Sequence, residues 1–166
     1  MRAKRCMPRP PRCTPWVSGY RSAAKSSPTQ MAAFNGTTMT RLDHVAVPVS
    51  DMDAAIAFYR DKLGLKLLSR EIDPKEQEEF AFLELAGGRL ELLKSLAQPF
   101  HRPAVQPPYC PHVALRTDDM AAAVRLIEEQ QLTLIKGPMI IEGQATWLYI
   151  ADPDNNLIEF VQWLDR

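Results

Sequence analysis

Two histidines and two glutamates occur in this sequence as matched pairs. Glu91 follows His44 by 47 positions, and Glu159 follows His112 by the same interval. Imidazole nitrogens and carboxylate oxygens are ligands that divalent transition metals accept together in mixed sites. Two carboxylates converging on one cavity would repel each other, and a divalent cation offsets their charge. The two pairs therefore predict a site for one divalent ion, with nickel, zinc, cobalt, manganese and iron as candidates.

The pairs belong to an internal repeat with a constant offset of 68 positions. Residues 42–47 (LDHVAV) match residues 110–115 (CPHVAL), Met52 matches Met120, and residues 90–92 (LEL) match residues 158–160 (IEF). A repeat that keeps its offset from the first predicted strand to the last, with no net insertion, predicts two copies of one structural unit.

The order of elements can be read within each copy. Ser50 is expected to cap the first helix, with Asp53 three residues later as its capping-box partner. An apolar stripe at helical spacing follows, and Gly64 is typical of a helix C-terminus. Both copies read as one strand, one helix and three further strands. The expected elements are strand 44–49, helix 52–63 and strands 65–71, 78–84 and 89–94, then strand 110–116, helix 119–130 and strands 132–137, 145–150 and 156–162.

The strand period of two predicts where the four candidate ligands point. Val45 and Val47 alternate with His44, so the aliphatic face is expected to lie under the amphipathic helix and the histidine on the opposite, concave face. The same alternation places His112 and Glu159 on the concave face of the second copy. Two alternatives remain from the residues alone: a metal site, or a polar network that holds no metal. A third histidine, His101, lies in the Pro-rich linker and reads as a surface residue, although it could reach the mouth of the cavity.

Composition and charge limit the classes of function. Residues 1–42 contain eight basic residues and no acidic one, whereas residues 43–166 contain 12 basic and 20 acidic residues. A strongly acidic body is a poor partner for nucleic acid, and no stretch approaches the ~20 apolar residues that span a bilayer. Three cysteines without a CxxC pair fit a reducing compartment and no disulfide framework. We therefore expect a cytoplasmic protein, with Cys110 as a small core residue.

The predicted domain organisation has four parts. Residues 1–40 lack a periodic apolar face and are expected to be a disordered basic tail. That tail is either an over-long start or an Arg- and Ser-rich transit peptide, which would direct the protein to a mitochondrion or plastid. The first module spans residues 41–95, a Pro-rich linker spans 96–108, and the second module spans 109–163.

Five segments in this order resemble the vicinal oxygen chelate superfamily, which includes glyoxalase I, bleomycin resistance proteins and extradiol dioxygenases. The matching segments are 42–47, 57–64, 88–93, 111–115 and 152–160. The resemblance implies an α+β fold in which two tandem βαβββ modules form a curved, incomplete eight-stranded barrel. It also implies that His44, Glu91, His112 and Glu159 are the metal ligands, on the first and last strands of each module. A homodimer is common in the family, sometimes with the site shared between chains.

The closest resemblance is to glyoxalase-I-like and methylmalonyl-CoA-epimerase-like members. It implies a metal-dependent lyase or isomerase that acts on a small substrate with vicinal oxygens, such as a thiol or CoA adduct, through a metal-stabilised enediolate. Glu159 is expected to be the general base and Glu91 its counterpart. Three alternatives stay open: an epimerase, an iron-dependent ring-cleaving dioxygenase that uses His44, His112 and Glu159, and a non-catalytic binding protein.

Overall fold

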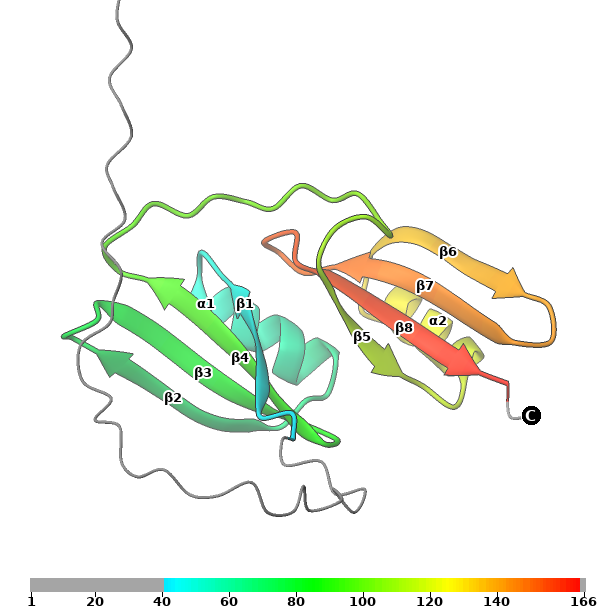
Figure 1. Cartoon of the computed structure of the whole chain (residues 1–166), viewed down its shortest axis with the longest axis horizontal. Helices are drawn as coiled ribbons and strands as arrows, with labels where there is room; N and C mark the ends of the chain where they lie inside the picture. The colour runs from blue at the N-terminus through cyan, green and yellow to red at the C-terminus, as the bar shows by residue number, and fades with distance from the viewer. Residues whose placement is uncertain (1–40, 165–166) are drawn as a thin grey trace, which may run out of the picture. The chain divides into compact units, whose positions relative to one another are not determined.

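The computed structural model describes residues 41–164, and the predictions for residues 1–40 lie outside this range. Each module follows the predicted order of one strand, one helix and three strands (Figure 1). The first module contains β1 (His44–Pro48), α1 (Met52–Ile56), the π-helical η1 (Ala57–Lys62), β2 (Leu67–Asp73), β3 (Glu78–Leu85) and β4 (Gly88–Ser95). The second contains β5 (His112–Arg116), α2 (Met120–Glu129), β6 (Thr133–Ile141), β7 (Ala145–Ala151) and β8 (Leu157–Trp163).

The strands form two four-stranded mixed sheets, one in each module. Their orders are β1-β4-β3-β2 and β5-β8-β7-β6, and the first strand of each module pairs in parallel with its last. The predicted α+β fold of two tandem βαβββ modules is confirmed. Within the described residues the sheets do not close into a barrel, which agrees with the expected incomplete one.

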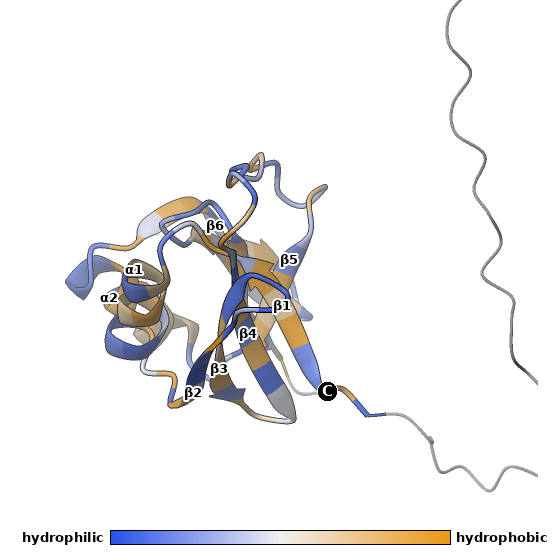
Figure 2. Cartoon of the chain, turned by 90° about the vertical axis from the view of Figure 1, so that its left-hand side faces the viewer, coloured by the Kyte–Doolittle hydropathy of each residue, from blue (hydrophilic) through white to orange (hydrophobic). Residues whose placement is uncertain are grey.

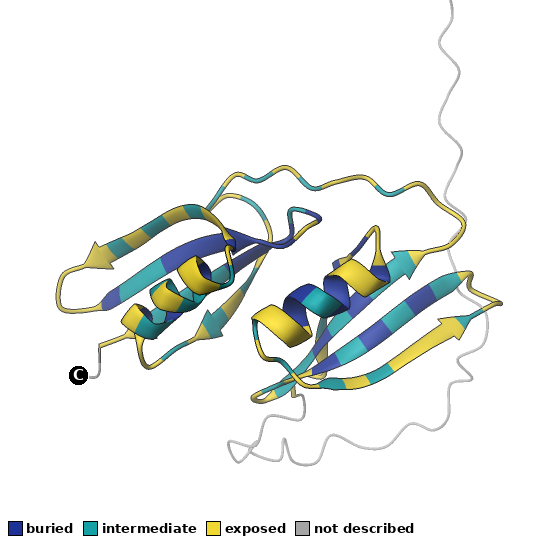
Figure 3. Cartoon of the chain, turned by 180° about the vertical axis from the view of Figure 1, so that it is seen from behind, coloured by how far each residue is buried: buried dark blue, intermediate teal, exposed yellow. Residues whose placement is uncertain are grey.

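Each helix covers one face of its own sheet (Figure 2). The helix of the first module buries the predicted stripe, including Met52, Ala55, Ile56 and Tyr59, against Leu90 and Leu92 of β4. Buried positions alternate with intermediate ones along β3 and β4 of the first sheet, whereas β7 of the second sheet ends in a continuous buried run (Figure 3). We call the opposite, uncovered face of each sheet its open face. Because side chains alternate along a strand, the candidate ligands of each module point to its open face.

The N-cap of the first helix lies one residue later than the sequence predicted. Asp51, not Ser50, is the N-cap, and its carboxylate accepts from the backbone N–H of Ala54 at 3.0 Å. Ser50 instead donates from its backbone N–H and its hydroxyl to the two carboxylate oxygens of Asp154, at 2.7 and 2.5 Å. The Ser50 capping box was wrong because this serine has a partner 104 positions away, which local pattern reasoning cannot see.

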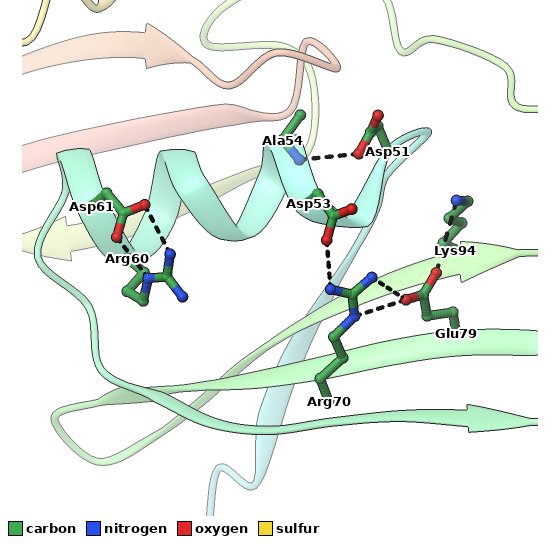
Figure 4. A network of polar contacts seen from close by, with 8 residues as sticks. All are labelled: Asp51, Asp53, Ala54, Arg60, Asp61, Arg70, Glu79 and Lys94. Atoms are coloured by element: carbon green, nitrogen blue, oxygen red, sulfur yellow. Dashed lines mark hydrogen bonds and ion pairs between the residues drawn. The ribbon is translucent and has the colours of Figure 1, made fainter.

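The two modules attach the start of the helix to the sheet by different chemistry. In the first module the guanidinium of Arg70 bridges Glu79 on β3 and Asp53 on α1, and Lys94 approaches Glu79 from β4 (Figure 4). Glu79 is buried, so these cations offset the cost of its charge.

At the position of Lys94 the second module has Gln162. Its carboxamide accepts from the backbone N–H of Met120 at 3.0 Å and donates to the carbonyl of Asp118 at 2.9 Å. The same attachment of helix to sheet is therefore made by neutral hydrogen bonds.

The turn between β7 and β8 packs its polar side chains onto the first module. The hydroxyl of Tyr59 donates to Asp152 at 3.0 Å, and the carboxamide of Asn156 donates to the carbonyl of Pro48 at 2.8 Å. Asp152 also accepts from the backbone N–H groups of Asp154 and Asn156. Burial raises the pKa of the Asp152 carboxyl, and burial beside Asp152 raises the pKa of Tyr59. Asn155 has a φ of 68°, as the sequence predicted for this turn.

Candidate functional site

The first candidate pair lies on neighbouring strands of the first sheet. His44 opens β1 and Glu91 lies in the middle of β4, and the ring Nε2 of His44 is 3.3 Å from a carboxylate oxygen of Glu91. The other ring nitrogen, Nδ1, is 2.7 Å from the carboxylate of Asp43. Asp43 also pairs with Arg89, whose guanidinium lies 4.6 Å above the ring of Phe82. These contacts hold the imidazole in one orientation, with Nε2 toward Glu91.

The second pair repeats this arrangement on the second sheet. His112 opens β5, and its Nε2 is 3.1 Å from a carboxylate oxygen of Glu159 on β8. Its Nδ1 is 3.0 Å from the backbone carbonyl of Cys110. The predicted strand from residue 110 in fact begins at His112, and half-buried Cys110 lies just before it. We call His44 with Glu91 the first half-site, and His112 with Glu159 the second half-site.

The hydrogen-bond partner of Nδ1 determines whether Nε2 of a neutral imidazole has a proton or a free lone pair. A carbonyl oxygen only accepts hydrogen bonds, so the Nδ1 of His112 carries a proton. An ionised carboxylate also only accepts, so the Nδ1 of His44 carries a proton beside Asp43. The neighbouring histidine and Arg89 lower the pKa of Asp43, which keeps that carboxylate ionised. In a neutral imidazole Nε2 then has a lone pair. A lone pair facing a carboxylate oxygen is repelled unless a proton or a metal ion lies between the two atoms.

The geometry of each half-site fits a divalent ion. Two ligand atoms at about 2.1 Å from one ion and at right angles to each other are about 3 Å apart, close to the separations of 3.1 and 3.3 Å found here. Hydrogen bonds from the outer ring nitrogen to a carboxylate or a backbone carbonyl are the usual supports of metal-binding histidines. His44, Glu91, His112 and Glu159 are the residues that would hold the ion.

The structure does not bring the four predicted ligands together within one chain. Among residues 41–164, no group of three or more His, Cys, Asp or Glu side chains lies close enough to hold one metal ion. The predicted ligands instead form the two half-sites, one on each sheet. The sequence left open whether the site lies within one chain or is shared between two chains, and in this chain the ligands lie as two separate pairs.

An aromatic ring lies against the histidine of each half-site. The ring of Phe82 on β3 meets the ring of His44 edge to face, with centroids 5.8 Å apart. Tyr149 on β7 meets His112 in the same way at 5.5 Å. The pKa of Tyr149 is raised by burial and by the charge of Glu159, so this phenol stays protonated beside the half-site.

Only partial signals for these supporting residues are present in the sequence. Asp43 was missed because its repeat-equivalent position holds Pro111, so no symmetry pointed to it. Phe82 and Tyr149 pair with Glu91 and Glu159, respectively, yet they are 67 positions apart rather than 68. The residues of β3 and β7 are thus displaced by one position relative to the constant offset of 68 in the repeat. Aligning the strands by their pairing, rather than by the constant offset, would have found both rings.

Comparisons with known proteins agree with this architecture. A family model described as the Glyoxalase/Bleomycin resistance protein/Dioxygenase superfamily matches residues 41–160. The chain belongs to this superfamily. Most of the described residues, including both half-sites, fall within the match. The family expected from the sequence is thereby confirmed.

Individual relatives are distant. The chain is 33% identical to the uncharacterized protein YwbC of Bacillus subtilis over 126 residues, which covers 74% of this chain and 97% of YwbC. It is 28% identical to a lactoylglutathione lyase of Haemophilus influenzae, over 72% of this chain and 90% of the lyase. The structure of a glyoxalase I variant from Zea mays has a TM-score of 0.64 at 23% identity, over 75% of this chain and 46% of that chain. This last similarity shows the fold alone.

No helix among the described residues is long and apolar enough to cross a membrane. His101 is exposed and lines a pocket of mixed polar and apolar residues, with Ser50 and Lys94, that contains neither half-site. It therefore takes no part in the site described above.

Proposed function

We propose that this protein is a metal-dependent lyase or isomerase of the glyoxalase I type, acting on a small substrate with two adjacent oxygens. The observation that carries the proposal is the orientation of both histidines, whose Nε2 atoms face carboxylates at metal-ligand separations while Nδ1 is engaged elsewhere. The relatives named lactoylglutathione lyase support this class of reaction. A bound divalent ion would supply a Lewis acid for the negative charge that develops on the substrate oxygens.

Residues of the chain would carry out the proton transfer. A carboxylate that faces the reacting carbon would accept its proton and return it to the neighbouring carbon, which moves a hydrogen without any net redox change. We assign this role to Glu159 and keep Glu91 as its counterpart in the first half-site. The apolar residues near Glu159 would limit the access of water to the proton transfer once a substrate covers them.

We further propose that a complete site is assembled from two chains. One half-site provides only two protein ligands, and within residues 41–164 the two half-sites do not meet. In a symmetric homodimer, the first half-site of one chain can face the second half-site of the other. Two identical sites result, each with two imidazoles and two carboxylates.

Mixing two inactive variants tests both parts of this proposal. One chain carries His44→Ala with Glu91→Ala, and the other carries His112→Ala with Glu159→Ala. Each homodimer should lack metal and activity. A mixed dimer has one site with all four ligands intact, so co-refolding should restore about one metal ion per dimer, measured by elemental analysis.

Restoration of metal without dimers in light scattering, or no restoration while the unmutated protein binds one ion per chain, would exclude the shared site. No metal bound by the unmutated protein, even on titration, would exclude metal dependence altogether. Activity is measured on a panel: the methylglyoxal–glutathione hemithioacetal, methylmalonyl-CoA, catechols, and fosfomycin with thiols. Oxygen-consuming cleavage of catechols would instead favour the dioxygenase alternative.

A further inference from the structure

The open face of the second module carries an apolar pocket that begins at its half-site. The pocket has a volume of about 290 Å³ and is mainly apolar, and it also contains the charged residues Lys136 and Glu159. Its lining residues are Pro108, Lys136, Met139, Ile141, Ala145, Trp147, Tyr149, Glu159, Val161 and Trp163. Trp147 pairs with Val161 on the adjacent strand, one step beyond the pair of Tyr149 with Glu159. We call this cavity the tryptophan pocket.

The course of the strands shows where the pocket leads. Residues two positions apart on a strand are separated by about 6.6 Å on the same face. The pocket therefore runs from Glu159 along β8, past Val161, to Trp163 about 13 Å away. Trp163 and Ile141 remain about half exposed at its far end, at 55% and 45%. A group that extends from the half-site along the strands would cover them.

The apolar lining is more extensive in the second module than in the first, where only Phe80 and Leu93 match Trp147 and Val161 as apolar residues beyond the half-site. Strand pairing identifies the same places on the first sheet, where they hold Glu71, Asp73, Glu78 and Ser95 instead of Met139, Ile141, Ala145 and Trp163. The fold accepts charged and polar residues there. The concentration of apolar and aromatic side chains beside Glu159 therefore calls for a ligand-binding explanation.

We infer that the tryptophan pocket receives a flat, apolar group of the substrate, attached to one of the two oxygen-bearing carbons. This inference rests on the proposed function and specifies its substrate class: compounds with vicinal oxygens and an aryl or similarly bulky substituent. Two indole rings and the Tyr149 ring offer faces and edges for stacking. An apolar cavity of about 150 Å³ is known to hold benzene, so about 290 Å³ accommodates a phenyl ring with a short connection.

Two small hydroxamates provide the test, because both chelate a metal through adjacent oxygens and differ only in their substituent. Acetohydroxamate carries a methyl group and benzohydroxamate a phenyl group. We expect the metal-loaded full chain to bind benzohydroxamate at least about tenfold more tightly, since the ring leaves water for an apolar pocket. Calorimetry gives both affinities, and tryptophan fluorescence reports entry into the pocket.

Two substitutions on one strand provide a matched control. Met139→Glu puts a charge into the pocket, at a position where the first sheet already carries Glu71. It should abolish the preference for benzohydroxamate and leave the affinity for acetohydroxamate unchanged. Ile140→Glu, on the opposite face of the strand at a 72% exposed position, should leave both affinities unchanged. Trp147→Ala is a second pocket variant in case Met139→Glu does not fold.

The outcomes separate this inference from the function on which it rests. If neither hydroxamate binds the metal-loaded protein, the proposed metal chemistry fails and the inference with it. Equal affinities would overturn the substrate class alone, and the proposed function would stand. Equal affinities together with a weaker dimer in Met139→Glu would assign the pocket to contact between two chains and would also overturn the inference.

Discussion

The two modules share a chain path and a ligand pair, but they support that pair differently. In the first module a side chain, Asp43, accepts from the outer nitrogen of the histidine, whereas in the second a backbone carbonyl does so. Phenylalanine lies against one histidine and tyrosine against the other. A repeat can therefore keep its central residues in register while every supporting contact is built independently.

The open faces differ even more than the half-sites. Along the open face beyond Glu91 the first sheet has Glu71, Asp73 and Glu78. At the matching positions beyond Glu159 the second sheet has Met139, Ile141 and Ala145. A site assembled from one half-site of each kind would have one charged wall and one apolar wall. Such a site can orient an unsymmetrical substrate, which a site made of two identical halves could not do.

Removal of either histidine should have the largest effect on bound metal and activity, and the effect should be the same for the two modules. His44→Ala and His112→Ala each remove one imidazole ligand, so both should lose bound metal together with activity. Elemental analysis and turnover on the responsive substrate measure the two losses. An active, metal-bound His44→Ala protein would mean that the first half-site is not part of the metal centre.

Substitution of the two carboxylates should have different effects on turnover in the two modules. Glu159→Gln keeps an oxygen that can bind the metal but cannot take a proton, so the turnover number should fall by about 10²- to 10⁴-fold with most metal affinity retained. Glu91→Gln should be milder, because the base lies in the other half-site. A full rate in Glu159→Gln would reverse this assignment and make Glu91 the candidate base.

The hydrogen-bond acceptor of the first histidine is the side chain of Asp43, which a substitution can remove. The acceptor of the second histidine is a backbone carbonyl, which a substitution cannot remove. Asp43→Ala leaves His44 without its acceptor and should weaken metal binding by about 10- to 100-fold, the usual effect of losing an outer hydrogen-bond partner. Competition with a chelator of known affinity measures the change. Lys66→Ala is the control, because its contact with Glu84 is exposed and outside both half-sites. An unchanged affinity in Asp43→Ala would show that the Asp43 contact does not support the metal centre.

The contribution of the contact between the modules to stability should depend on the hydroxyl group of Tyr59. Tyr59→Phe removes a hydrogen bond to the buried carboxylate of Asp152, which should lower the free energy of unfolding by about 1.5–3 kcal/mol. Denaturant titration measures the change, and Tyr109→Phe, at a 92% exposed position, should be neutral.

The same variant should show a defined pH dependence. The Tyr59 hydrogen bond lowers the pKa of Asp152 against the stronger effect of burial, which raises it. Without the hydroxyl the folded-state pKa rises further. The loss of stability should therefore be largest at neutral pH and shrink as the pH falls through the raised pKa of Asp152. A loss that grows on acidification would contradict this sign.

The sequence predicted the elements and the ligand pairs because these follow from periodicity and repetition. Alternation along β1 and β8 correctly separated aliphatic from functional positions, and the equivalence of His44 with His112 identified the pairs. The grouping of ligands was not predictable, because equivalence within a repeat does not give the distance between its copies. The same limit explains Ser50, which was expected to cap a helix and instead binds Asp154.

The supporting residues were the least predictable part of the site. Asp43 has no counterpart in the second copy, and the displacement of β3 and β7 hid the equivalence of Phe82 with Tyr149. The apolar positions of β6 could not be assigned to the open face beside Glu159 until their pairing with Trp147 and Ala145 was known. These features depend on which strands are neighbours, and one sequence gives that information only indirectly.

The turn at residues 152–156 also makes the order of the modules matter for protein engineering. It supplies buried carboxylates to a tyrosine of the first module, and the position equivalent to Tyr59 in the second module is Ile127, which has no hydroxyl. A chimera with two copies of the second module would place Asp152 opposite an aliphatic side chain, and one with two copies of the first would leave Tyr59 without an acceptor. The two halves are therefore not interchangeable parts, and a designer who duplicates either one must also redesign the contacts of this turn, including those of Asp154 with Ser50 and of Asn156 with Pro48.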